Sequence, residues 1–186
     1  MAKHTNRQSR VDGDLAYIPL TQGYEAIIDA ADVPLVSGVN WMAHVTRYRD
    51  GTIRCVYAYR NTPTIQRTNG KNPPIYLHRV LTEAPVSDTV DHRDGNGLNN
   101  RRNGDQCNLR LATREQNSQN RRVSRTKTSS GVKGVCWHDQ EKKWWARIRS
   151  KGKSHSLGLF GTIEDAAKAY ARASASLHGE FGCTTA

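Results

Sequence analysis

The chain has 186 residues, of which 36% are hydrophobic, and its 28 Lys and Arg against 17 Asp and Glu give a formal net charge of +11. So low an apolar fraction argues against one large core and favours small modules. The basic excess indicates a polyanionic partner, nucleic acid before an anionic membrane surface. The apolar stretches are too short to span a bilayer, and the first ten residues lack the apolar segment of a signal peptide. We therefore expect a cytoplasmic protein without a membrane partner.

The spacing of the cysteines argues against a structural zinc site and against a disulfide-stabilised fold. Cys55, Cys107, Cys136 and Cys183 lie far apart and form no C-x-x-C pair. This spacing signals neither a zinc knuckle nor a disulfide framework, so we expect reduced thiols and no structural zinc.

The positive charge is concentrated in one segment. Residues 121–155 carry 11 Lys and Arg against 2 Asp and Glu, whereas residues 1–120 carry 15 against 12. A merely soluble surface does not require such a concentration, so this segment is the first candidate for the polyanion-binding surface.

Residues 1–74 predict a β-rich segment behind a polar arm of about ten residues. The pair Asp50-Gly51, between aromatic and β-branched runs, predicts a hairpin turn. Residues 30–38 favour a short helical turn or loop, and residues 61–74 a polar loop. No motif assigns a role to residues 11–74, which either scaffold a neighbouring core or contact DNA. The expected strands occupy residues 15–20, 24–29, 40–48 and 53–60.

Residues 75–122 predict a helix, two strands and a second helix. The apolar spacing of residues 75–84 favours a short helix that ends near Pro85. Residues 86–92 and Asn108–Ala112 are expected to be strands on either side of a long polar loop. Thr113 is the expected N-cap of the second helix.

The polar residues of this region suit metal-dependent phosphodiester cleavage, which needs an oxygen ligand for a cation and a base for the attacking water. Asp91 can supply the ligand. His92 can supply the base, because its ordinary pKa lies near neutrality. Asn108 and Asn117 offer amide oxygens that bind a hard cation or fix an imidazole tautomer without adding negative charge. A regular strand would point Asp91 and His92 to opposite faces, so the strand must bend or end there.

This pattern resembles an HNH endonuclease of the phage and intron homing type. The resemblance rests on LHR at residues 77–79, VDH at residues 90–92, the loop GNGLNNRR, NLR at residues 108–110 and the spaced Asn117. It implies a strand-strand-helix (ββα-metal) nuclease core that uses Mg²⁺ or Mn²⁺. The implied roles are general base for His92, cation ligands for Asp91 and Asn117, and orientation of the base for Asn108. Beside such a site Arg101 and Arg102 are either phosphate contacts or solvated loop charges, and His78 is more often a core histidine than a catalyst.

A basic linker at residues 123–129 leads to a second module, in which three strand candidates precede an amphipathic helix. Thr162 is the expected N-cap, the stripe including Ile163, Ala166, Ala167, Tyr170 and Ala173 the buried face, and Gly179 the stop. The opening GVKGV, the strand WARIR, LGLF and the helix AAKAYARAS resemble the ethylene-response-factor (AP2) DNA-binding domain, over residues 130–181. The resemblance implies a three-stranded sheet in the major groove with a helix packed behind it.

Strand alternation supports a DNA-reading face. Trp145, Arg147 and Arg149 share one face, while Trp144, Ala146 and Ile148 share the other, apolar face. Arginine reads guanine bidentately and lysine mostly contacts phosphate. The predicted DNA contacts of this module are Lys133, Trp145, Arg147, Arg149, Lys151 and Lys153, with His155 beside them.

The sequence thus predicts an α+β protein with four parts: a β-rich segment (residues 1–74), a nuclease core (75–122), a linker (123–129) and a DNA-binding domain (130–186). The predicted activity is metal-dependent nicking or double-strand cleavage of duplex DNA by a monomer or homodimer, in the host cell cytosol if phage-encoded. The alternative is a DNA-binding regulator with an inactive nuclease core.

Overall fold

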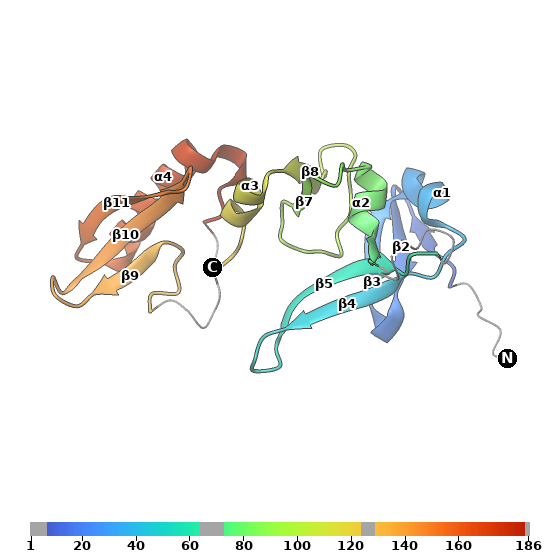
Figure 1. The fold of residues 1–186 in the computed structure, drawn as a ribbon, viewed down its shortest axis with the longest axis horizontal. Coiled ribbons are helices and arrows are strands. Elements are labelled where there is room, and N and C mark those ends of the chain that lie inside the picture. Colours follow the sequence, from blue (N-terminus) through green and yellow to red (C-terminus); the bar gives the residue numbers. More distant parts are fainter. Residues whose placement is uncertain (1–6, 64–72, 124–128, 185–186) are drawn as a thin grey trace. The chain divides into compact units, whose positions relative to one another are not determined.

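The computed structural model describes residues 7–63, 73–123 and 129–184, which contain four small β-sheets, several short helices and one longer helix (Figure 1). The chain divides into two compact units, residues 1–111 and 112–186. Most of the predicted linker at residues 123–129 and most of the predicted loop at residues 61–74 lie outside the described residues. All four cysteines are free thiols.

The first unit is built mainly from β-strands. The first antiparallel sheet contains β1 (Arg10–Asp12), β2 (Leu15–Pro19) and β3 (Glu25–Asp29), and the second contains β4 (Met42–Arg47), β5 (Ile53–Arg60) and β6 (Ile75–Tyr76). The third pairs β7 (Thr89–His92) with β8 (Leu109–Ala112). Its helical segments are η1 (Thr21–Gly23), η2 (Ala30–Asp32), α1 (Val33–Val36) and α2 (Leu77–Thr82).

These elements follow the predicted strand runs and the predicted hairpin. Between β4 and β5, Gly51 adopts the left-handed conformation, with φ +84°, that the Asp50-Gly51 turn requires. The helix expected over residues 75–84 is shorter. Its first two residues instead form β6 beside β5, and it ends at Thr82, before Glu83 in a left-handed conformation.

One hydrophobic core joins the N-terminal sheets to the region that carries the nuclease motif. Trp41, Ile28, Leu77 and Leu81 are almost fully buried in it, and Leu109 of β8 belongs to the same cluster. The N-terminal segment and residues 77–109 therefore pack as one unit, in which the segment of unassigned role forms part of the scaffold.

The second unit contains α3 and a three-stranded sheet packed on one long helix. Its elements are α3 (Arg114–Gln119), β9 (Val135–His138), β10 (Lys143–Ser150), β11 (Lys153–Phe160), α4 (Ile163–His178) and η4 (Gly179–Phe181). The sheet is antiparallel in the order β11-β10-β9. Thr113 and Thr162 cap α3 and α4 as predicted: each side chain accepts a hydrogen bond from the third helical residue.

The buried face of α4 differs partly from the predicted apolar stripe. The buried residues are spaced by four and include two polar ones, Ser174 and His178. A β-carbon at Gly182 would lie 2.5 Å from Ser174 Oγ, so the small serine admits close passage of the chain. The ring of His178 hydrogen-bonds the carbonyl of Arg149 over 2.9 Å. A pattern of hydrophobic residues does not identify these two positions. Ser174 is buried because a small side chain is needed there, and His178 is buried because its ring hydrogen-bonds a backbone carbonyl.

The mixed α and β architecture and the C-terminal sheet on a helix agree with the predicted fold class. The strand-strand-helix nuclease core is not seen as one packing unit, since β7 and most of β8 belong to the first unit and α3 to the second.

Candidate nuclease site and nucleic-acid interface

Asp91 lies on β7 in a buried ion pair with Arg110 of β8. Its Oδ2 accepts from Arg110 Nε over 2.9 Å and from Nη2 over 2.7 Å, and both side chains are less than 10% exposed. The guanidinium balances a carboxylate that would be costly to bury alone. Two motifs 19 residues apart, VDH and NLR, are thus joined by charge as well as by strand pairing.

His92 is the last residue of β7, so the strand ends where the sequence requires it to bend or end. Its Nε2 lies 3.2 Å from Oδ1 of Asn100, a residue with no solvent exposure. Asn100 Nδ2 donates to the carbonyls of Leu98 and Gly97, which fixes the amide with its oxygen toward the imidazole. An amide oxygen only accepts, so Nε2 carries the proton and Nδ1 the lone pair of the neutral ring.

The surroundings of His92 favour this neutral form. Burial lowers the pKa of His92 below its ordinary value of 6.5, against the opposing effects of the Asn100 hydrogen bond, Asp94 and Asp91. A neutral imidazole is the state that can accept a proton, as a general base must.

Two aromatic side chains hold the ring of His92. His78 of α2 packs edge-to-face on it at a centroid distance of 5.2 Å, and Tyr57 of β5 lies at 5.8 Å. Burial first, and then the electrostatic influence of the His92 ring and of Arg79, lower the pKa of His78 to about 3. His78 is therefore a neutral packing partner of His92, in line with its interpretation as a core histidine.

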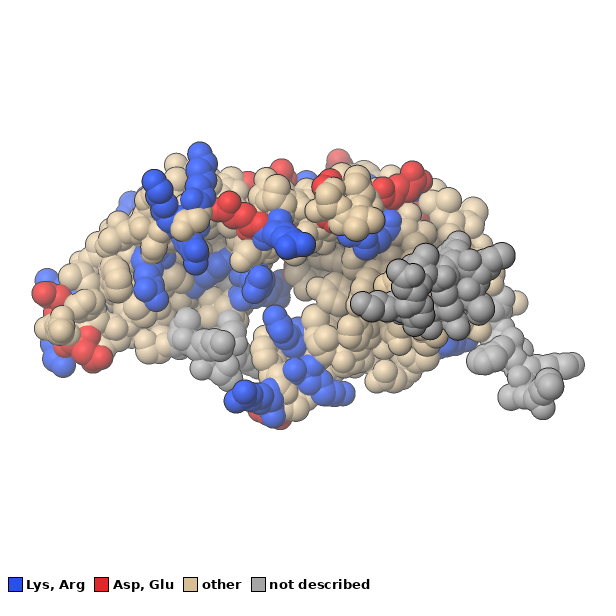
Figure 2. Space-filling model, viewed as in Figure 1, with Lys and Arg blue, Asp and Glu red and all other residues tan. Residues whose placement is uncertain are grey.

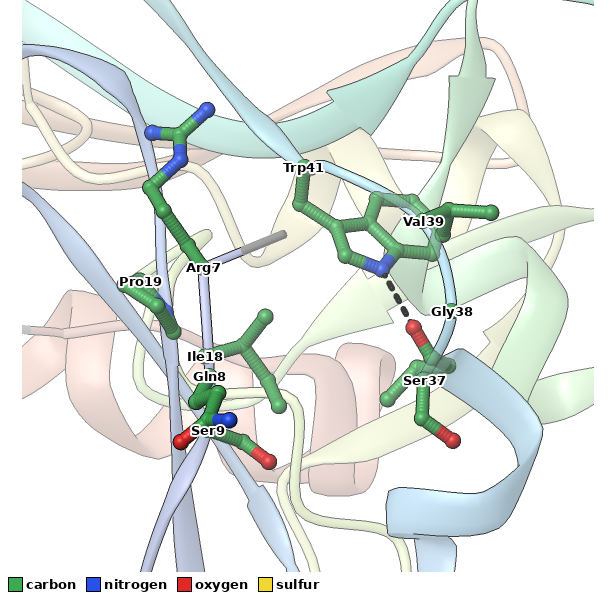
Figure 3. Close-up of a pocket in the computed structure, with 10 residues that line it drawn as sticks. Arg7, Gln8, Ser9, Ile18, Pro19, Ser37, Gly38, Val39 and Trp41 are labelled. Carbon is green, nitrogen blue, oxygen red and sulfur yellow. Dashed lines mark hydrogen bonds between the residues drawn. The ribbon is translucent and has the colours of Figure 1, made fainter. Parts of the chain in front are cut away.

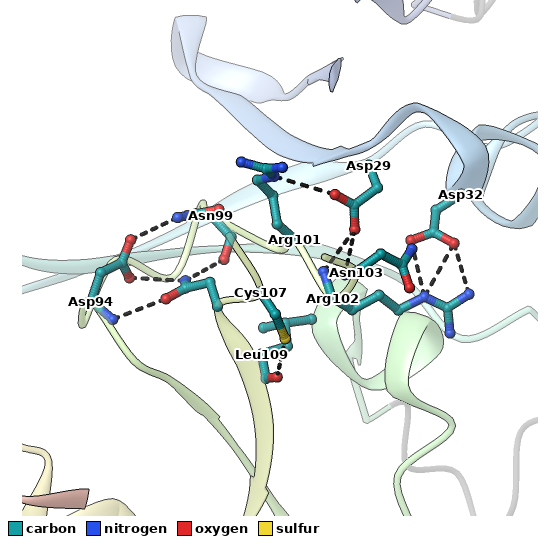
Figure 4. A network of polar contacts seen from close by, with 10 residues as sticks. Asp29, Asp32, Asp94, Asn99, Arg101, Arg102, Asn103, Cys107 and Leu109 are labelled. Carbon is teal, nitrogen blue, oxygen red and sulfur yellow. Dashed lines mark hydrogen bonds and ion pairs between the residues drawn. The ribbon is translucent and has the colours of Figure 1, made fainter. Parts of the chain in front are cut away.

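Asn108 holds the loop that follows β7. Its Oδ1 accepts from the backbone N–H of Asp94 over 2.9 Å, and its Nδ2 donates to Asp94 Oδ1 and to the carbonyl of Asn99 (Figure 4). The amide of Asn100 lies within hydrogen-bond distance of the imidazole, and the orientation of His92 by Asn108 stays a prediction. Asn108 therefore acts on the loop from which Asn100 reaches the ring. The sequence signal that could have pointed to Asn100 is the pair of asparagines at residues 99–100. Asparagine is also common in turns, so this pair does not by itself indicate a contact with His92.

Arg101 and Arg102 tie the same loop to the N-terminal segment (Figure 4). Arg101 Nε donates to Asp29 over 3.2 Å, and Arg102 pairs with Asp32 through Nε and Nη2. The hydrogen bonds to Asp32 raise the pKa of Arg102. The structure thus gives both arginines carboxylate partners, and their contact with DNA phosphate stays a prediction that competes with these ion pairs.

Asn117 lies half-buried on α3, in the second unit, so its sharing of a cation with Asp91 stays a prediction. Within this unit α3 is tied to the sheet module at both ends. Glu115 accepts from the backbone N–H of Lys151 over 2.5 Å, and Lys133 donates to the carbonyls of Gln119 and Arg121. Burial lowers the pKa of Lys133. The DNA contact at Lys133 stays a prediction that competes with these bonds to the carbonyls of Gln119 and Arg121.

The face expected to read DNA is exposed as predicted. Along β10, Arg147 and Arg149 are exposed, whereas Ala146 and Ile148 are buried against α4. Trp145 Nε1 donates to Ser156 over 2.9 Å, and the guanidinium of Arg147 lies 5.1 Å from the Trp145 ring centre. Lys151 and Lys153 are exposed at the turn between β10 and β11. Figure 2 shows Lys and Arg atoms gathered on this module.

A cavity of about 410 Å³ lies elsewhere in the first unit (Figure 3). Its walls come from the N-terminal stretch at residues 7–9, from β2, and from the chain between α1 and β4. Trp41 borders it and donates from its indole nitrogen to the carbonyl of Val36 over 2.9 Å. None of the predicted catalytic residues lines this cavity, so it has no part in the proposed chemistry.

Across residues 7–63, 73–123 and 129–184, no group of three or more His, Cys, Asp or Glu side chains could hold a metal. A cation at Asp91 would therefore depend on amide, water and phosphate oxygens for its other ligands. In the same ranges no helix is long and apolar enough to cross a membrane.

Comparison with known proteins identifies one domain and two relatives of the chain. Residues 130–180 match the AP2 domain family. Protein 3.8 of Escherichia phage T7 is 36% identical over 92 residues, which cover 50% of this chain and 71% of that protein. The chain belongs to the family of protein 3.8. An uncharacterized HNH endonuclease, L560, of Acanthamoeba polyphaga mimivirus is 37% identical over 107 residues.

The match to L560 covers 58% of this chain and 52% of the viral protein, about half its length. Together with the AP2 match it supports the combination of HNH and AP2 parts predicted from the motifs. Protein 3.8 and L560 are both viral proteins. No solved structure matches the chain.

Proposed function

We propose that the chain is a metal-dependent DNA endonuclease of the homing type, in which His92 is the general base. The observation that carries the proposal is the buried pair Asp91 and His92 at the end of β7, with His92 neutral and its tautomer set by Asn100. The likeness to a protein named as an HNH endonuclease and the AP2 domain support it.

In this mechanism His92 Nδ1 takes a proton from the water that attacks a phosphodiester. Asn100 keeps Nε2 protonated and the ring in place, and Asn108 holds the loop that carries Asn100. Asp91 and Asn117, as hard oxygen donors, would hold Mg²⁺ or Mn²⁺, which supplies positive charge to the phosphate when bound. The buried Arg110 holds Asp91 in position.

The AP2 sheet supplies the grip on duplex DNA. Arg147 and Arg149 face outward on β10 and are suited to base edges, whereas Lys151 and Lys153 are suited to phosphates. One nuclease site per chain favours nicking of one strand, and a homodimer would cut both. The alternative is a DNA-binding regulator with an inactive nuclease site. It gives no functional reason for the buried pair Asp91 and His92 and the hydrogen bond between His92 and Asn100.

A plasmid nicking assay with and without Mg²⁺ or Mn²⁺ separates the two functions. Wild-type protein should convert supercoiled DNA to the nicked or linear form only with the cation. His92→Ala should abolish cleavage and retain DNA binding, because it removes the base and no charge-bearing surface. Asn100→Ala should slow cleavage with binding retained. Cation-independent binding with no cleavage of any duplex by wild type would favour the regulator.

A further inference from the structure

The hairpin of β4 and β5 ends in an exposed basic tip in the first unit. Every residue from Arg47 to Arg54 is exposed, and this stretch holds three arginines and one acid. The acid, Asp50, bonds within the turn: its carboxylate accepts from the Thr52 N–H over 2.9 Å and from the Thr52 hydroxyl over 2.6 Å. Figure 2 shows Lys and Arg atoms at the free end of this hairpin.

The tip arginines differ from those nearer the candidate site. Arg101, Arg102 and Arg110 each pair with an aspartate. Across the described ranges no ion pair joins Arg49 or Arg54 to an acid, and Arg47 bonds only the carbonyl of Gly51, over 2.9 Å. The guanidinium groups of Arg49 and Arg54 are thus available to an anionic partner.

One face of the hairpin leads from this tip to His92. Ala43, Val45, Val56 and Ala58 pack inward, so the alternate residues His44, Tyr57 and Tyr59 lie on the outer face. Tyr57 contacts the ring of His92, and Tyr76 of β6 lies against Tyr57, Tyr59 and His44. Tyr57 lies six positions along the chain from Gly51 in the turn, a distance of roughly 20 Å at about 3.4 Å per residue. A duplex rises about 3.4 Å per base pair, so this is the length of roughly six base pairs.

We propose that the β4–β5 hairpin is a DNA-contacting arm, whose tip arginines bind backbone phosphates of the duplex that reaches His92. The inference rests on the proposed function for the identity of the partner, and on charge complementarity for the surface. It assigns residues 42–60 a binding role in addition to their role as scaffold. The aromatic outer face of the hairpin would then lie along the bound DNA strand, between the phosphates held at the tip and His92.

The test measures binding without cleavage. The full chain, Arg49→Ala/Arg54→Ala and Arg10→Ala are titrated with a 40-base-pair duplex of mixed sequence, in EDTA, at several salt concentrations. Arg10 is the matched control: it is exposed in the same unit but pairs with Asp12 and Glu25. If two phosphate contacts are lost, the double variant binds more weakly and its plot of log affinity against log salt flattens by about 1.8.

Arg49→Lys/Arg54→Lys, which keeps the charges, should restore the slope. The proposal is overturned if the double alanine variant shows the wild-type salt slope. It is also overturned if that variant binds DNA no more weakly than Arg10→Ala does. Because EDTA prevents metal-dependent cleavage, the result is independent of the nicking assay. Weaker binding by the double variant supports the arm even if wild type cuts no DNA, and an unchanged slope overturns it even if wild type cuts.

Discussion

Replacement of Asp29 by alanine should loosen the loop that carries Asn100. The Asp29 carboxylate is 9% exposed, and Oδ2 accepts from the backbone N–H groups of Arg102, over 2.8 Å, and Asn103, over 2.9 Å. A hydrogen bond to a charged group contributes about 1.5 to 3 kcal/mol. Loss of these two should therefore lower the free energy of unfolding by about 3 kcal/mol or more. The third contact, with the partly solvated Arg101, adds little.

Equilibrium unfolding in urea gives the free-energy change, and hydrogen exchange read by mass spectrometry localises it. Amides of residues 93–103 should exchange faster in Asp29→Ala, while those of α4 stay unchanged. Asp12→Ala is the control, because Asp12 is exposed and its ion pair with Arg10 spans 3.7 Å; such pairs contribute about 0 to 1 kcal/mol. If Asp29→Ala costs no more than Asp12→Ala, the N-terminal segment does not anchor the loop and the scaffold argument fails.

Three further changes test other parts of the structure. Gly97→Ala should cost about 1 to 3 kcal/mol in thermal unfolding, because a β-carbon there would lie 2.4 Å from the Tyr57 ring. His78 has a pKa of about 3 in the folded chain against 6.5 ordinarily, so the unfolded chain binds the proton first and stability should fall as pH drops from 6.5 toward 3. Urea midpoints measured against pH should show a shallower fall for His78→Gln, and an unchanged fall would contradict the assignment. Arg147→Ala should cost about 1 to 3 kcal/mol of binding and relax preference at one base, whereas Lys151→Ala should weaken all sequences alike, as affinities on varied duplexes would show.

Local patterns predicted most of the secondary structure, because the signals are short-range. Strand runs follow apolar alternation, and Thr113 and Thr162 cap helices through residues only three positions away. The buried and exposed faces of β10 follow the same logic, since successive side chains of a strand point to opposite faces.

The partners of the polar residues were not predictable in this way. Arg102 meets Asp32, 70 residues earlier in the chain, so a count of local charge leaves it looking available to DNA. Lys133 is open to DNA on the same count of local charge, whereas in the fold it donates to the carbonyls of Gln119 and Arg121. Asn100 receives no role from the sequence, because its bond to His92 depends on how the whole loop closes. Residue type gives the chemistry of such groups, but tertiary packing decides which of them face one another.

This distinction changes how the net charge of the chain should be interpreted. Salt-dependent DNA affinity counts only cations that exchange small counterions for phosphate. An arginine held by a buried aspartate, as Arg110 is by Asp91, keeps its protein partner and contributes little to that exchange. The exposed cations of the AP2 sheet, Lys151 and Lys153 among them, and the exposed arginines of the β4–β5 tip do not have to leave a buried carboxylate to reach phosphate. The salt slope of the full chain should therefore be set by these two surfaces and fall well short of the value that its 28 basic residues suggest.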